Sequence, residues 1–123
     1  MINSKLISDL HPRVAKMAKT FVDICNSKGI DIIITSTYRD NESQDALYAQ
    51  GRTKQGNKVT NARGGSSFHN YQLAFDFLPG RHGKYDWNDI DLFKQCGAIG
   101  KSLGMEYAGD WKSFKDLPHF QVA

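Results

Sequence analysis

The chain has 123 residues, of which 40% are hydrophobic and 24% are charged, and its formal net charge is +3. This length fits one domain with a single core, and the composition excludes a disordered or low-complexity protein. No apolar run approaches the roughly 20 residues that span a bilayer, so stable membrane insertion is not expected. The basic residues are scattered, which favours solubility over nucleic-acid binding as the reason for the mild positive charge.

The N-terminus indicates where the protein is made. Residues 1–5, MINSK, lack the basic start and the long apolar core of a secretory signal. We therefore expect synthesis and folding in a cytoplasm. If the target lies outside the membrane, another agent must release the protein.

The first third of the chain predicts a helix and then a strand. Apolar residues recur at helical spacing after Pro12, which suits a first helical turn, and Gly29 ends this helix. Residues 30–37 are rich in β-branched side chains and predict a buried strand. Cys25 and Cys96 lie within helical apolar patterns and belong to no CxxC motif, which predicts buried free thiols. A disulfide is the alternative, and cytoplasmic folding disfavours it.

A second helix and a long loop follow. Asn41 resembles an N-cap, with Gln44 three residues later as in a capping box, so a helix is expected over residues 42–50. Residues 51–67 are rich in Gly, Asn, Thr, Lys and Arg and have no periodicity. They predict a long surface loop of the kind that often carries function.

The next predicted strand contains an unusual carboxylate. Residues 72–78 alternate in side-chain direction, with Asp76 on the face opposite to Phe75 and Phe77. The pair Pro79-Gly80 is expected to end this strand.

The last third predicts a long helix over residues 89–103, which Gly104 ends, and short strands at 105–107 and 119–122 around a loop that contains Trp111. Its expected core contacts are Ile90, Phe93, Ile99 and Leu103. The order of elements indicates an α+β domain.

Four residues suggest a metal-dependent hydrolase. Asp76 has apolar neighbours, where a carboxylate is costly to bury unless it is paired or bound to a cation, and its own spacing favours an arginine partner over a metal. His69 and His119 add two imidazoles, which completes a common catalytic zinc set with one position open for water. Asp116 is a second carboxylate that could act as a general base beside that water.

Two stretches resemble motifs of a known peptidase family. Residues 67–76, SFHNYQLAFD, resemble the SxHxxGxAxD motif of the D-alanyl-D-alanine carboxypeptidase and L-alanyl-D-glutamate peptidase family. Residues 116–120, DLPHF, resemble its (E/D)xxH motif, and Thr37-Tyr38-Arg39 with the segment 44–53 looks like its upstream block. The resemblance implies a small antiparallel sheet with flanking helices around a single zinc site, shared with Hedgehog domains. It also implies that residues 1–123 form a single catalytic domain without a separate cell-wall-binding domain.

The resemblance assigns roles to five residues. His69, Asp76 and His119 would hold one Zn²⁺ ion, and Asp116 would activate water and pass a proton to the leaving amine. Arg39 matches the arginine that steadies the developing oxyanion or a substrate carboxylate. A plain ion pair is the alternative role for Arg39.

Substrate contacts are expected from three further residues. Ser67 either contacts substrate or serves as an ordinary turn residue. Gln72 stands where the motif has glycine, which permits unusual dihedral angles, and we expect its side chain to reshape a substrate wall. Trp111 is the third expected contact.

The resemblance therefore implies a zinc metallopeptidase that acts on the peptide stem of bacterial peptidoglycan. The segment 47–53, LYAQGRT, looks more like the endopeptidase branch, which cuts between L-alanine and D-glutamate. A monomeric bacteriophage endolysin, made in the host cytoplasm and released to the wall by a holin, is expected. The alternatives are a D-alanyl-D-alanine carboxypeptidase of wall metabolism and a non-catalytic zinc-containing binding domain.

Overall fold

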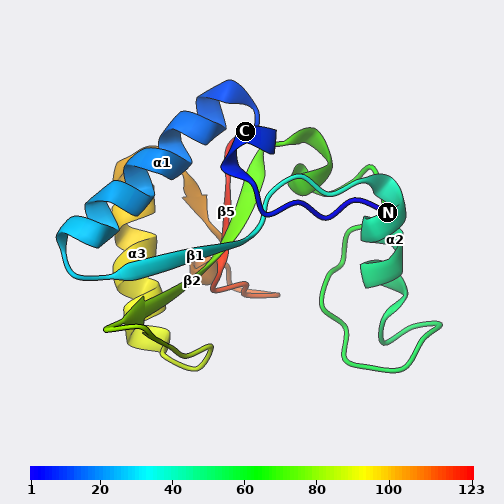
Figure 1. Ribbon diagram of the computed structural model, residues 1–123. Coiled ribbons are helices and arrows are strands. Elements are labelled where there is room, and N and C mark those ends of the chain that lie inside the picture. The colour runs from blue at the N-terminus through cyan, green and yellow to red at the C-terminus, as the bar shows by residue number, and fades with distance from the viewer.

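The computed structural model describes residues 1–123 and combines one antiparallel sheet with three α-helices (Figure 1). The helices are α1 (Pro12–Ser27), α2 (Asn41–Ala49) and α3 (Ile90–Ser102). The strands are β1 (Asp31–Ser36), β2 (Ala74–Arg81), β3 (Lys84–Tyr85), β4 (Glu106–Tyr107) and β5 (His119–Gln121). Short 3-10 helices lie at Ile7–Asp9, Phe68–Tyr71 and Ala108–Asp110. The predicted α+β architecture is confirmed, and no helix is long and apolar enough to cross a membrane.

The register of the sheet brings distant polar residues into one row. The strand order is β1-β2-β5-β4, with β3 paired to β2, and every pairing is antiparallel. Asp76 in β2 pairs with Ser36 of β1 on one side and with His119 of β5 on the other. A register shift between Ile34 and Ser36 marks a bulge, a feature that is common beside active sites.

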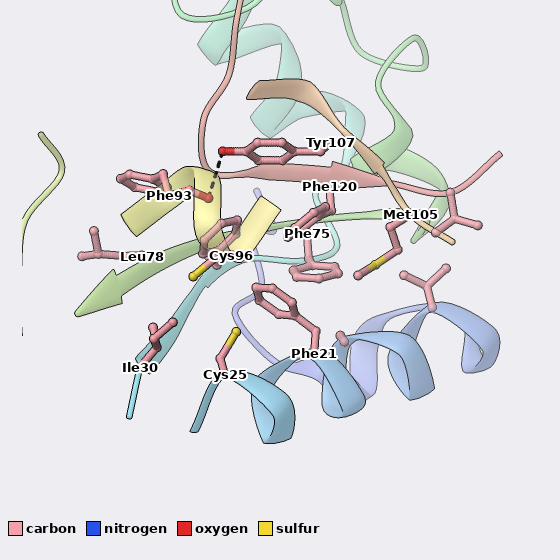
Figure 2. Close-up of a cluster of buried hydrophobic side chains, with 14 of the residues drawn as sticks. Phe21, Cys25, Ile30, Phe75, Leu78, Phe93, Cys96, Met105, Tyr107 and Phe120 are labelled. Atoms are coloured by element: carbon pink, nitrogen blue, oxygen red, sulfur yellow. Dashed lines mark hydrogen bonds between the residues drawn. The ribbon is translucent and has the colours of Figure 1, made fainter. Parts of the chain in front are cut away.

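The hydrophobic core lies between the sheet and helices α1 and α3. The Phe21 ring of α1 packs against Phe75 and Phe120 (Figure 2) and also against Phe77, with ring centroids 5.0 to 5.9 Å apart. Phe75 and Phe77 flank Asp76 in β2, so the carboxylate points to the opposite face of the sheet, as the alternation predicted. The same core contains both cysteines as buried free thiols, which confirms that prediction.

The start of α2 differs from the prediction. Asp40, not Asn41, is the N-cap, and its carboxylate accepts a hydrogen bond of 2.8 Å from the backbone N–H of Ser43. Gln44 is fully buried and takes no part in a capping box. The chain from 51 to 67 contains no helix or strand, which confirms the predicted loop, and Figure 1 shows this loop and α2 apart from α1 and α3.

Three other predictions were wrong. The strand that was predicted to be buried, β1, is mostly half-buried, and Ile33 is 41% exposed. Strand β2 does not stop before Pro79 but runs on to Arg81. At Pro79 the only paired neighbour is Ile32 of β1, because β5 reaches only as far as Asp76, so the missing N–H is tolerated. Ile90, expected in the core, is 52% exposed at the first residue of α3.

The N-terminal residues add an unpredicted support to the segment that follows β1. The backbone of Ser4 exchanges hydrogen bonds with Thr37 and Tyr38, and the N–H of Asp40 donates to the carbonyl of Ile2. In Figure 1 this N-terminal segment runs beside the chain that connects β1 to α2. These hydrogen bonds from residues 2–4 hold the segment 37–40 in place.

Candidate metal centre and active site

Three potential metal ligands converge on the face of the sheet opposite to the core. One ligand atom from each of His69, Asp76 and His119 lies within 4.8 Å of the other two. The Oδ1 atom of Asp76 is 3.2 Å from Nε2 of His69 and 3.0 Å from Nδ1 of His119. The structure thus brings together the three residues that the sequence assigned to the metal.

His69 is held in one orientation by its surroundings. It lies in the 3-10 helix Phe68–Tyr71, where Ser67 is the N-cap and accepts a hydrogen bond from the His69 backbone N–H. The ring nitrogen Nδ1 is 2.7 Å from the carbonyl oxygen of Thr37. A carbonyl only accepts, so Nδ1 carries the proton, and the lone pair of Nε2 faces Asp76.

Asp76 is surrounded by cationic and hydrogen-bonding groups. Its side chain is 18% exposed, and Nη2 of Arg39 lies 3.7 Å from its Oδ2 atom. Burial alone would raise the pKa of Asp76, but the imidazoles of His69 and His119, when protonated on both nitrogens, attract and hydrogen-bond the carboxylate and hold its pKa well below the usual range. Burial lowers the pKa of His119, and the hydrogen bond and charge of Asp76 reverse this effect and raise it.

The donor set fits a zinc ion. Each imidazole directs one nitrogen to a protein acceptor, Thr37 or Gln121, and the other nitrogen to the same carboxylate oxygen of Asp76. Two imidazoles and one carboxylate with supporting hydrogen bonds are typical of catalytic zinc sites. The arginine partner that was the alternative for Asp76 is also present, so the two interpretations coexist.

Arg39 follows β1 and is fixed within the protein. Its guanidinium donates from Nη1 to Oε1 of Gln44 at 2.8 Å and from Nη2 to Oγ of Ser36 at 2.9 Å. The Nε atom is buried without a partner, and the residue lines the cavity. Burial lowers the pKa of Arg39, while the negative charges of Asp76 and Asp116 oppose this shift. Arg39 is thus a positioned cation with donor capacity left for a ligand.

Asp116 lines the same cavity as the three potential ligands but is outside their cluster. Its backbone N–H donates to the carbonyl of Ala108, and its own carbonyl accepts from the N–H of His119. Burial and the negative charge of Asp76 raise the pKa of the Asp116 carboxyl above its usual range. A carboxyl with a raised pKa is suited to accept and return protons.

A cavity of about 660 Å³ opens over these groups. Ser67 and Trp111, both expected as substrate contacts, lie in its wall. The Trp111 ring centroid is 5.9 Å from that of His119, and its indole N–H donates to Glu106. Ser67 therefore both caps a helix and faces the cavity, so the two roles considered for it are compatible.

Gln72 is not part of the cavity wall, contrary to its expected role as a substrate contact. Its backbone has φ of 64°, in the left-handed region, which explains why the related motif has glycine there. Its side chain turns away and donates to the carbonyl of Asp9 at 2.7 Å.

Several supporting residues were not predicted. Gln44 donates to the carbonyl of Ala62, and thereby joins Arg39 to the loop 51–67. Asn70 donates to the carbonyl of Arg39 and accepts from the N–H groups of Gly65 and Ser67. The only sequence signal was their position inside the motif blocks, because an amide side chain can take either role in many environments.

Proteins of known sequence and structure resemble this chain over most of its length. The peptidoglycan L-alanyl-D-glutamate endopeptidase CwlK of Bacillus subtilis is 44% identical over 130 residues, which cover 94% of this chain and 74% of CwlK. The L-alanyl-D-glutamate peptidase of Listeria phage A118 is 31% identical over 117 residues, which cover 94% of this chain but only 38% of the phage protein. Among solved structures, a zinc-containing variant of the vancomycin-resistance D,D-pentapeptidase VanY has a TM-score of 0.69 at 18% identity, with 99% of this chain and 78% of that chain covered. This last similarity shows the fold alone.

The family follows from these comparisons and from the motifs that the structure assembles. The family model described as "VanY: D-alanyl-D-alanine carboxypeptidase" matches residues 7–114, a range that contains Arg39, His69 and Asp76. With this match, and with CwlK 44% identical over 94% of this chain and 74% of its own length, the chain belongs to the VanY family.

Proposed function

We propose that this chain is a zinc peptidase that hydrolyses the L-alanyl-D-glutamate bond in the peptide stem of bacterial peptidoglycan. The observation that carries the proposal is the convergence of His69, Asp76 and His119 beneath a cavity that Arg39 and Asp116 also line. The names of the Bacillus and phage relatives support the bond, and the Zn(II) in the VanY structure supports the metal.

His69, Asp76 and His119 would hold the ion, with Nε2, a carboxylate oxygen and Nδ1 as the ligand atoms. When bound, zinc supplies a Lewis acid that makes water nucleophilic at neutral pH and polarises a carbonyl. The chain keeps Thr37 and Gln121 hydrogen-bonded to the outer nitrogens of the two imidazoles, which keeps the inner nitrogens unprotonated.

Asp116 acts as the general base of the proposed reaction. Its carboxylate accepts a proton from the attacking water and then returns the proton to the amine that leaves. Its raised pKa brings the carboxyl closer to neutrality, where a group can both take and give a proton. An aspartate with the usual low pKa would be a weaker base.

Arg39 stabilises the negative charge that develops on the carbonyl oxygen of the scissile bond. Gln44 and Ser36 each accept from one terminal nitrogen, so the guanidinium is oriented before substrate arrives. Donors that are oriented in advance need no rearrangement as charge develops. Because Arg39 lines the cavity, the Nη–H donors that Gln44 and Ser36 leave free are available for the substrate.

The proposal includes the setting in which the enzyme acts. We propose that residues 1–123 act as one catalytic unit, because the core is continuous and the ligands come from both halves of the chain. The phage relative supports a role in host cell lysis, with the protein made in the bacterial cytoplasm and then released to the wall. A monomeric state remains a prediction.

A second candidate activity is removal of the terminal D-alanine from the stem peptide. The description of the matched family model, D-alanyl-D-alanine carboxypeptidase, favours it. The two activities use the same metal site and differ in the bond that is placed beside it.

Mass spectrometry of fragments released from purified peptidoglycan tests the proposal. Internal cleavage after L-alanine would produce new D-glutamate amino termini. Release of free D-alanine as the sole product would instead assign the chain to the carboxypeptidase reaction. The His69→Ala variant is the control for a contaminating hydrolase, because it removes one of the three proposed ligands.

A further inference from the structure

The side chains behind His119 form a chain of hydrogen bonds that leads to the molecular surface. Nε2 of His119 lies 2.9 Å from Oε1 of Gln121, and Nε2 of Gln121 donates to Oε2 of Glu106 at 3.1 Å. The same Glu106 oxygen accepts from the indole N–H of Trp111 at 3.0 Å. Neither Gln121 nor Glu106 belongs to the motifs that identify the family.

The register of the sheet creates this chain of bonds. Glu106 of β4 is paired directly with Gln121 of β5, and Gln121 lies two residues after His119, on the same face of β5. Glu106 is exposed, Gln121 is half-buried and His119 is buried. This series of hydrogen bonds therefore runs from solvent to the proposed metal ligand.

The carboxylate of Glu106 determines the direction of every hydrogen bond in this series. An ionised carboxylate only accepts hydrogen bonds, so Glu106 requires the amide nitrogen of Gln121 to face it. The amide oxygen of Gln121 must then face His119, and an oxygen at this position requires an N–H at Nε2. With the proton on Nε2, the lone pair of Nδ1 is directed toward Asp76 and the proposed metal position.

We propose that Gln121 and Glu106 are positioning residues for the metal centre: Glu106 orients the Gln121 amide, and Gln121 holds His119 in the tautomer that binds metal through Nδ1. This inference rests on the proposed metal site and adds two residues to it. It also predicts that the exposed Glu106 controls zinc affinity although it contacts no ligand atom.

Reversal of polarity at Glu106 provides the main test. Glu106→Lys replaces an acceptor by a donor, so the Gln121 amide must turn and present its N–H groups to the Nε2–H of His119. We expect this clash to lower zinc affinity by about 10- to 100-fold, the usual effect of losing a residue that supports a metal-binding histidine. Gln121→Met, which removes the acceptor at similar size, should lower affinity by a comparable factor.

A double variant distinguishes the mechanism from general damage. In Glu106→Lys/Gln121→Glu, the new glutamate accepts from both the lysine and His119 Nε2–H, so the polarity of the bond to His119 is restored. We expect zinc affinity to return to within about threefold of the unchanged protein, whereas damage to the fold would accumulate in the double variant.

A matched control addresses the change of charge. Asp110→Lys makes the same change at another exposed acidic residue, whose carboxylate pairs with Lys101 rather than with Gln121. This variant should keep the zinc affinity of the unchanged protein.

The readouts are the zinc dissociation constant, from competition with a chromophoric chelator, and the Nε2–H signal of His119 in 15N-histidine NMR spectra of the zinc-loaded protein. We expect a slowly exchanging Nε2–H signal in the unchanged protein and faster exchange in Gln121→Met. Unchanged affinity in both single variants, or no recovery in the double variant, overturns the inference. Absence of zinc binding by the unchanged protein would instead overturn the proposed function.

Discussion

Replacement of Arg39 by lysine separates a catalytic role from a structural one. Lysine keeps the positive charge but has a single nitrogen, so it cannot donate to Gln44 and Ser36 in the fixed geometry of the guanidinium and also face the substrate. At least one of these buried acceptors would lose its donor.

Two effects of different size follow from this loss. An unsatisfied buried acceptor costs about 1–3 kcal/mol, so the free energy of unfolding should fall by that amount. Loss of a positioned donor to the developing oxyanion typically lowers kcat by about 100- to 1,000-fold, which corresponds to about 2.7–4 kcal/mol of transition-state stabilisation. The second effect applies to molecules that remain folded.

The assay measures both quantities on the same preparations. Urea unfolding gives the folded fraction, and release of new amino termini from purified peptidoglycan gives the rate per folded molecule. Arg81→Lys is the matched control, because Arg81 is exposed and makes a single hydrogen bond to Gln95, far from the cavity wall. Both quantities should stay unchanged in this control.

One result would refute the reasoning. If Arg39→Lys unfolds more easily but each folded molecule keeps its activity within about threefold, the expected loss of an oxyanion donor is absent. Arg39 would then act only as the ion-pair partner of Asp76, to which it lies at 3.7 Å.

Three further outcomes are expected. Removal of metal by a chelator should abolish activity and lower the melting temperature, and added zinc should restore both. The reason is that one ion would hold β2, β5 and the 3-10 helix of His69 together. Full activity after metal removal that elemental analysis shows to be complete would contradict the metal site. Asp116→Asn should keep zinc and lose about 100- to 10,000-fold in rate. Because the pKa of Asp116 is raised, the unchanged enzyme should lose activity as pH falls through that raised value. The residual activity of the Asn variant should not show this fall at low pH. If the Asn variant instead loses zinc in step with activity, Asp116 is a metal ligand. Gln72→Gly should leave kcat/KM unchanged, since Gln72 lies outside the cavity wall. A large change in specificity for stem peptides would show instead that Gln72 contacts the substrate.

Much of this protein was predictable from local sequence patterns. Apolar spacing identified α1 and α3, alternation placed Asp76 opposite to Phe75 and Phe77, and the motifs identified the residues that the cavity brings together. Such patterns are readable because helix and strand periodicities involve neighbours in sequence. The errors at Asn41 and Pro79 were also local, and they arose where two adjacent residues offered similar signals or where a strand edge tolerated a missing N–H.

Only the tertiary structure determined which polar groups meet. Asp76 lies beside Ser36 and His119 because of strand register, and the pairing of Glu106 with Gln121 has the same origin. A polar side chain can donate or accept in many settings, so its sequence position does not identify its partner. Residue types therefore indicated the chemistry of the site, while contacts across distant segments determined the orientation of its ligands and the residues that hold them.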